Sequence, residues 1–240
     1  MKLCDLHTHI LPGVDDGAPT MEYALHMLRN AHASDVTLLA VTPHYNTPYG
    51  NGWSSAEELQ ERFLQLKQAA ADIPVELVLG AEVRVSEDLP KLLKTGDVPT
   101  LNASRYLLTE FSGNTQPGEF ISGLQGILDC GYVPLIAHPE RYSAVCRQPE
   151  MVIQWLDMGC HLQLTGESIM GMYGKTVQRA ANVLLRNDLV ACVASDAHGI
   201  NGRSNFLLEV YDHLSVRYSK AYANGLLSIN PARICNNQSL

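Results

Sequence analysis

The residues best suited to chemistry in this chain are imidazoles and carboxylates, most of which stand where an apolar, strand-like run stops. There are nine of them: His7, His9, Asp16, His44, Glu82, Glu110, His138, Asp196 and His198. One metal ion takes three or four protein ligands, so this set is too large for a single zinc ion. It suits a cluster of two or three ions that share bridging carboxylates. Because such clusters readily catalyse the hydrolysis of oxyanion substrates, the set indicates a metal-dependent phosphoesterase.

The spacing of two pairs supports a shared site. Side chains at positions i and i+2 of a strand point the same way, so His7 and His9 can reach one ion. Asp196 and His198 have the same spacing. Imidazoles combined with carboxylates suit Mn, Fe or Zn. An H-x-H pair alone is weak evidence, but charged groups buried at several strand ends need partners or a metal.

Two glutamates are the natural bridging ligands. A carboxylate can hold two ions, whereas an imidazole usually serves one, so we expect Glu82 and Glu110 to bridge. A salt bridge is the alternative role for Glu110. In the PGVDDG segment, either Asp15 or Asp16 could be a ligand, because V-D-D-G is also a favourable turn.

Two arginines are expected at the same mouth as the ligands. Arg141 follows His138 by three residues, and Arg203 lies in the loop that begins at Ser195. An arginine fork matches phosphate oxygens and stays charged, so both are candidates for phosphate binding. Surface ion pairs are the alternative.

Other side chains of the right type are expected to have ordinary roles. These are the histidines on helical patterns or at a strand start, His26, His32, His161 and His213. Tyr45 and Tyr49, after His44, could form a rim that receives an extended peptide, or they could be plain loop aromatics.

The elements that must position these residues alternate between strands and helices. Seven strand-like runs end near His7, Thr42, Glu82, Glu110, His138, Thr165 and Ser195. Helical patterns lie between most of them, and Thr20 and Ser55 are expected to cap two of these helices. The alternation predicts an α/β fold with a parallel sheet and helices outside. Because a barrel gathers its carboxyl strand ends around one mouth, we expect a closed barrel over a doubly wound open sheet.

The composition bounds the class of protein. A chain of 240 residues with no Gly/Pro/Ser linker predicts one domain over residues 1–240. The net charge of −8 argues against a nucleic-acid partner, although bound cations still allow an anionic substrate. The cysteines show no C-x-x-C pair, which is typical of reduced thiols. Without a signal core or a spanning apolar run, we expect a cytoplasmic protein with no membrane insertion.

Five motifs carry a family resemblance. DLHTHILPGVDDGA, TPHY, GAEV, AHPERY and SDAHGINGR follow the order of the polymerase-and-histidinol-phosphatase (PHP) superfamily of metal-dependent phosphoesterases. Within it, the chain most resembles the bacterial tyrosine-protein phosphatases encoded with capsule and exopolysaccharide genes, over about residues 3–233. LPGVDDG, HPERY and SDAH with a following GR are far more specific than H-x-H. The resemblance implies a distorted (β/α)7 TIM-like barrel of the PHP type.

The resemblance also implies three divalent ions, usually manganese, and a division of the ligands among them. The first ion would lie on His7, His9, Glu82 and Asp196. The second would lie on Glu82, Glu110 and His138, and the third on Asp16, His44 and His198. On this basis alone Asp16 is chosen over Asp15. Arg141 and Arg203 match the family's phosphate-contacting arginines, and the implied substrate is phosphotyrosine, typically on the tail of a tyrosine autokinase that controls polysaccharide export.

Two positions depart from the family pattern. Many relatives carry a second histidine after T-P-H, where this chain has Tyr45, and the QLTG segment at residues 163–166 is less typical. Neither is expected to touch a proposed ligand, so both should affect substrate range more than chemistry.

The predicted reaction is single-step hydrolysis, in which an ion-bridged hydroxide attacks phosphorus in line while ions and arginines hold the phosphoryl oxygens. No cysteine has an arginine six positions later, so the C-x5-R loop of cysteine-dependent tyrosine phosphatases is missing. The nearest alternative is a PHP phosphoesterase acting on a small phosphomonoester such as histidinol phosphate. Further alternatives are a polymerase-associated nuclease, an amidohydrolase and a binding module with structural metals. An amidohydrolase would need a bridging lysine where this chain offers Glu82 and Glu110.

Overall fold

The strands all run parallel and fall into two hydrogen-bonded sheets. This computed structural model describes residues 2–47 and 55–240. The smaller sheet has the order β1 (Leu3–Asp5), β2 (Val36–Val41) and β4 (Glu76–Leu79). The larger sheet has the order β3 (His44–Tyr45), β5 (Glu82–Arg84), β6 (Tyr106–Glu110), β7 (Val133–Ala137), β8 (His161–Thr165) and β9 (Cys192–Ala194).

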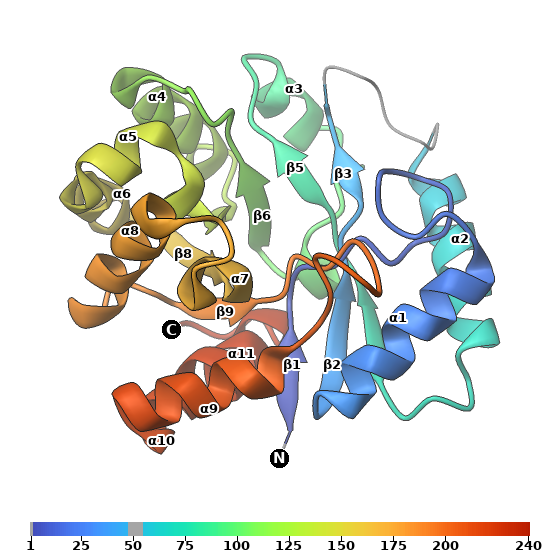
Figure 1. Cartoon of the computed structure of the whole chain (residues 1–240). Coiled ribbons are helices and arrows are strands. Elements are labelled where there is room, and N and C mark those ends of the chain that lie inside the picture. Colours follow the sequence, from blue (N-terminus) through green and yellow to red (C-terminus); the bar gives the residue numbers. More distant parts are fainter. Residues whose placement is uncertain (1, 48–54) are drawn as a thin grey trace.

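The two sheets are joined on both sides. β3 follows β2 after two residues and β5 follows β4 after two residues, so each pair forms one interrupted strand. On the other side, Thr8 pairs with Ala197 just beyond β1 and β9, and the His9 N–H donates to the Ala197 carbonyl at 2.9 Å. The strands surround the centre of the molecule with the helices outside (Figure 1). The prediction of an α/β fold with the distorted (β/α)7 TIM-like barrel arrangement is confirmed.

The helices between and after the strands include those that the sequence predicted and several short ones that it did not. They are α1 (Met21–Ala33), α2 (Ala56–Ala69), α3 (Leu89–Leu93), α4 (Pro117–Leu128), α5 (Ser143–Arg147), α6 (Val152–Asp157), α7 (Gly166–Met170), α8 (Lys175–Arg186), α9 (Leu207–Arg217), α10 (Lys220–Asn224) and α11 (Asn230–Cys235). Shorter turns are the 3-10 helices η1 (Leu101–Ala103), η2 (Pro139–Arg141) and η3 (Pro149–Met151), and the π-helix η4 (Gly225–Ile229).

The predicted helix caps are confirmed. The Thr20 side chain accepts a hydrogen bond from the backbone N–H of Tyr23 at the start of α1, and Ser55 accepts one from Glu58 at the start of α2. Five-residue helices such as α3 and α7 offer too few apolar positions to show a helical period, so the sequence pattern did not reveal them. In the part of the chain that the structure describes, no helix combines the length and apolar character that a membrane span requires.

An aromatic cluster outside the barrel anchors the segment that leaves β7. Phe120 of α4 and Trp155 of α6 are fully buried, with ring centroids 4.7 Å apart. The Tyr142 ring lies 5.4 Å from Phe120, and its hydroxyl donates to the carbonyl of Ala137 at the end of β7. The short stretch between Ala137 and Tyr142, which carries His138, is therefore tied down at both ends.

We expect the substitution Trp155→Ala to lower the free energy of unfolding by about 3–5 kcal/mol, because it leaves a cavity where a large aromatic packed. Leu64→Ala, on the exposed face of α2, is the control and should change stability by less than about 0.5 kcal/mol. Urea denaturation of both variants measures the difference. Equal midpoints for the two variants would show that the cluster does not stabilise the fold.

Candidate metal centre

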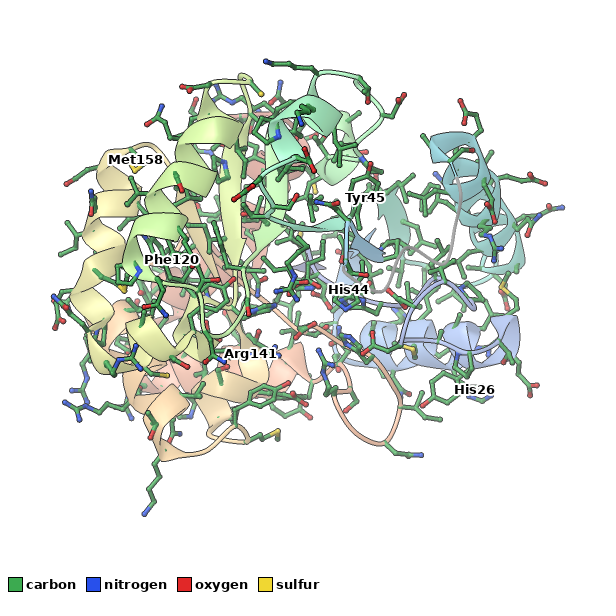
Figure 2. All side chains as sticks on the ribbon, turned by 90° about the horizontal axis from the view of Figure 1, so that it is seen from above. His26, His44, Tyr45, Phe120, Arg141 and Met158 are labelled. Atoms are coloured by element: carbon green, nitrogen blue, oxygen red, sulfur yellow. The ribbon has the colours of Figure 1, made fainter. Side chains whose placement is uncertain are left out.

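The structure brings all nine candidate ligands to the carboxyl ends of the strands. His7 and His9 follow β1, His44 begins β3, and Glu82 begins β5. The others come from the end of β6, the turns after β7 and β9, and the loop before α1: Glu110, His138, Asp196, His198 and Asp16. Most are buried, whereas the Asp16 side chain is 63% exposed. Figure 2 looks down on this end of the molecule, with His44 and Arg141 toward the middle and His26 on the outer side.

The pairing of the strands sets which candidates face each other. The Thr8–Ala197 bridge places the H-x-H and D-x-H pairs on neighbouring strands, because each pair flanks one partner of the bridge. In the same way, His44 is the direct register partner of Glu82, and Arg84 is the partner of Glu110. Both interrupted strands resume at a candidate ligand, so the interruptions position His44 beside Glu82.

Glu82 is the centre of the cluster. Its Oε1 lies 2.7 Å from His138 Nε2 and 3.4 Å from His7 Nε2. Its Oε2 lies 2.9 Å from His44 Nδ1 and 3.4 Å from His9 Nε2. Burial raises the pKa of Glu82, but the surrounding imidazoles outweigh it and hold the pKa well below its usual range. The result is an ionised carboxylate whose two oxygens face different imidazoles, as a bridging ligand requires.

The two imidazoles of the H-x-H pair bring their Nε2 atoms close together. His7 Nδ1 lies 2.9 Å from Gln163 Oε1, and the Gln163 amide nitrogen donates to the Leu164 carbonyl, so Nδ1 must carry the proton. His9 Nδ1 donates to Asp15 Oδ2 at 2.8 Å. The Nε2 atoms of His7 and His9 lie only 3.2 Å apart and both face Glu82. A divalent cation bound between them would displace any proton from these nitrogens and be held by both.

The carboxylates make the centre attractive for positive charge. Burial lowers the pKa of His9, but Asp15 and Glu82 raise it to about 9. Burial also opposes protonation of His44, yet Asp16 and Glu82 raise its pKa to about 11. A proton and a metal ion compete for the same imidazole nitrogen, so these shifts describe sites that a divalent cation can take over. Burial, aided by Arg141, instead lowers the pKa of His138 to about 4 and keeps it neutral.

The geometry distinguishes the two adjacent aspartates. Asp16 Oδ1 lies 3.4 Å from both His44 Nε2 and His198 Nε2. Asp15 points away from that gap and accepts hydrogen bonds from His9 Nδ1 and from the backbone N–H groups of His44 and Gly17. Asp16 is therefore placed to share an ion with two imidazoles, whereas Asp15 orients His9.

Gly17 explains why this loop can approach so closely. A Cβ at this position would overlap the carbonyl oxygen of His9, so only glycine allows the V-D-D-G turn to pack against the H-x-H segment.

Several buried polar atoms of the cluster have no hydrogen-bond partner in the described part of the chain. They include Asp196 Oδ1, Glu110 Oε1, His138 Nδ1 and His198 Nε2. Such atoms are costly to bury, and a bound ion would satisfy those that face the cluster. Among the described residues, the candidate ligands form three groups, and within each group one ligand atom per residue lies within 4.8 Å of the others. The groups are His9, Asp16, His44 and His198; His7, His9 and Glu82; and His44, Glu82 and Glu110. The donor set fits two or three divalent ions.

Glu110 has contacts that suit either of its expected roles. Its Oε1 lies 3.2 Å from Arg84 Nε and 3.6 Å from His44 Nδ1. Burial, and then the charge of Glu82, raise the pKa of Glu110 to about 7. Arg84 is not among the predicted site residues, although its position two residues after Glu82 in one strand was a usable signal.

Both candidate arginines converge on one oxygen. Arg141 Nη1 lies 2.6 Å and Arg203 Nη2 2.8 Å from Asp196 Oδ2, while Asp196 Oδ1 faces His7 Nε2 at 3.4 Å. Because Asp196 is buried, these are not the surface ion pairs considered as the alternative. The backbone φ angles of His138, Asp196 and Arg203 are +37°, +54° and +47°. Left-handed conformations at non-glycine residues are strained and concentrate at functional sites.

The expectation that the QLTG segment, which departs from the family pattern, touches no proposed ligand is wrong. Gln163 does touch a proposed ligand, because alternation along β8 turns it into the barrel, where it accepts the His7 Nδ1–H hydrogen bond. Tyr45 instead packs against the apolar cluster that includes Val83 and Leu89. Tyr49 lies outside the described residues.

A cluster of imidazoles and carboxylates at the mouth of a parallel α/β barrel is the type of site that defines a metal-dependent hydrolase. The model of a family described as capsular polysaccharide synthesis, CpsB/CapC, matches residues 3–236. The chain therefore belongs to the CpsB/CapC family.

Individual relatives agree with this membership over nearly their whole length. The tyrosine-protein phosphatase CpsB of Streptococcus pneumoniae is 33% identical, with 98% of this chain and 99% of that protein covered. The putative tyrosine-protein phosphatase CapC of Staphylococcus aureus is 30% identical, with 94% and 88% covered. A crystal structure from work on YwqE of Bacillus subtilis and CpsB of S. pneumoniae, described as metal-dependent tyrosine phosphatases, has a TM-score of 0.91 at 28% identity and covers 100% of this chain and 96% of its own.

Replacing Gln163 with Leu should weaken the binding of Mn²⁺ by about 10- to 100-fold, because His7 loses the acceptor that fixes its Nδ1 proton. Gln163→Glu retains an acceptor at the same place and should bind the ion much more tightly than the leucine variant. Calorimetric titration of metal-free protein measures both affinities. A leucine variant with wild-type affinity would show that Gln163 does not orient His7.

Proposed function

We propose that this protein is a metal-dependent protein-tyrosine phosphatase in which residues 1–240 form one catalytic domain. The proposal depends on the convergence of imidazoles and carboxylates around the buried Glu82, beside two arginines that share Asp196. The tyrosine-protein phosphatases of the same family, and the metal-dependent character of the solved relatives, support it.

The ligands would divide among three ions. We assign the first ion to His7, His9, Glu82 and Asp196. The second would be held by Glu82, Glu110 and His138, and the third by Asp16, His44 and His198. Nitrogen and oxygen donors of this kind suit manganese, which we propose, as well as iron or zinc. When bound, such ions lower the pKa of a coordinated water to about 7 and offset charge on phosphoryl oxygens.

The chain's own residues would bind and orient the phosphoryl group. Arg141 and Arg203 are partly exposed, and each guanidinium has N–H groups beyond the one that Asp196 accepts. They can therefore donate to phosphoryl oxygens while Asp196 holds them in place. Behind the ligands, Gln163 and Asp15 retain the Nδ1 protons of His7 and His9, so that the Nε2 lone pairs face the cluster.

Two buried cysteines, Cys4 and Cys160, are poorly suited to be nucleophiles. A catalytic thiol needs a lowered pKa. Burial instead raises the pKa of Cys4 to about 11 and that of Cys160 to about 12. Neither of these two thiols is therefore activated for a phosphocysteine route.

The substrate we propose is a phosphotyrosine protein or peptide, specifically the tail of a tyrosine autokinase that controls capsule or exopolysaccharide synthesis, encountered in the cytoplasm. The family's description as capsular polysaccharide synthesis supports this context. Comparing a phosphotyrosine peptide with histidinol phosphate as substrates separates this proposal from that of a small-molecule PHP phosphatase. Faster hydrolysis of histidinol phosphate would favour the small-molecule alternative.

Excess chelator should abolish hydrolysis of a phosphotyrosine peptide, and Mn²⁺ should restore it, because the proposed nucleophile is a water whose pKa the bound ions would lower. Iodoacetamide should leave the rate unchanged at concentrations that alkylate accessible thiols. The measurement is phosphate release before and after each treatment. Full activity in chelator, or loss of activity upon alkylation alone, would contradict the mechanism.

Two substitutions test the proposed ligand and phosphate-binding residues. His138→Ala should nearly abolish turnover, and Arg141→Ala should reduce kcat/KM on the order of 10²-fold, as expected for one transition-state donor. His26→Ala and Arg186→Ala, on exposed positions of α1 and α8, are matched controls that should keep wild-type rates. Wild-type kinetics in either site variant would mean that the chemistry takes place elsewhere.

A further inference from the structure

An aromatic side chain lies directly beside one of the proposed phosphate-binding arginines. The ring of Tyr173, in the turn between α7 and α8, has its centroid 4.8 Å from Cζ of Arg141. This is a cation–π contact at the rim of the metal centre. Just before the half-buried Tyr173 in the chain, Met172 is 64% exposed, and Met170, at the end of α7, is 36% exposed. The rim therefore presents an aromatic ring next to a cation.

The turn that carries Tyr173 has a defined backbone. Gly171 and Gly174 adopt φ angles of +85° and +90°, which favour glycine. The N–H of Gly171 donates to Ser168 and that of Met172 to Glu167, which closes the turn onto α7. A Cβ at Gly171 would meet the side-chain amide of Gln178. A turn with these constraints holds Tyr173 in a fixed place rather than leaving it to move freely.

The Tyr173 side chain stays neutral. Burial, and then the neighbouring Glu167, raise the pKa of Tyr173 to about 12. Near neutral pH it is a phenol and not a phenolate, so it adds no negative charge beside Arg141 and Arg203 that would repel a phosphate.

We propose that Tyr173 is a specificity-determining residue that selects phosphate esters with an aromatic leaving group, because its ring offers the substrate ring a surface for packing. This inference rests on the proposed function, which places the phosphate on Arg141. In phosphotyrosine a single oxygen joins phosphorus to the ring, so a substrate held by Arg141 has its ring close to the side chain that packs on Arg141. Aromatic pairs gain free energy beyond burial, whereas an aliphatic ester gains little from this surface.

The contact with Arg141 suggests a competing role, in which Tyr173 only positions the guanidinium. The two roles differ in what they do to different ligands. A positioning role affects every phosphate-like ligand equally. A packing role affects only ligands that carry a ring, and it needs the ring of Tyr173 but not its hydroxyl.

The test compares the affinities of benzylphosphonate and methylphosphonate for Mn²⁺-loaded protein by calorimetry. Wild-type protein should bind benzylphosphonate more tightly. Tyr173→Leu should weaken the binding of benzylphosphonate about 10-fold more than that of methylphosphonate. This factor corresponds to the upper part of the free-energy range for an aromatic pair. Tyr173→Phe should keep the wild-type preference. Tyr218→Leu, which removes a tyrosine that packs on Tyr222 at the end of α9, is the matched control and should also keep it.

Several results would overturn the inference. Equal weakening of both phosphonates in Tyr173→Leu would leave only the positioning role, and an unchanged preference would show that the ring is not used. A phenylalanine variant that behaves like the leucine variant would assign the effect to the hydroxyl. Wild-type protein that binds neither phosphonate would overturn the proposed function itself, which is a separate result.

Discussion

The burial of several carboxylates among imidazoles is the constraint on which the rest of this structure depends. Glu82 and Asp196 are almost completely buried, and each oxygen of Glu82 faces two imidazole nitrogens. Buried carboxylates without compensating positive charge are strongly unfavourable. The two arginines supply part of that charge at Asp196. The imidazoles, with ring nitrogens directed inward, leave positions that divalent cations are suited to fill.

The fold meets this constraint through strand register. A single bridge, Thr8–Ala197, places two alternating pairs of ligands next to each other, and the pairing of β3 with β5 places His44 beside Glu82. The left-handed backbone at His138, Asp196 and Arg203 directs side chains from strand ends toward the same mouth. Strain of this kind persists only where surrounding contacts determine the conformation, and the Tyr142 anchor after β7 is one such contact.

The sequence predicts those features that are local. Alternation along a strand is enough to pair His7 with His9 and Asp196 with His198, and the strand–helix rhythm is enough to predict the parallel barrel. The choice of Asp16 over Asp15 came only from the family resemblance, since both belong to one good turn. The contact of Gln163 with His7 was not predicted, because the two residues are 156 positions apart and only the order of strands around the barrel brings them together. The contact of Arg84 with Glu110 likewise depends on the pairing of β5 with β6, although the position of Arg84 two residues after Glu82 already placed it on the same face of that strand.

Anomalous X-ray scattering from crystals grown with Mn²⁺ tests the shared cation site most directly. The account predicts two or three manganese peaks at the mouth of the barrel, with Glu82 in contact with more than one of them. Difference maps with no peak between Glu82 and the surrounding imidazoles, in crystals whose solvent contains saturating Mn²⁺, would contradict it.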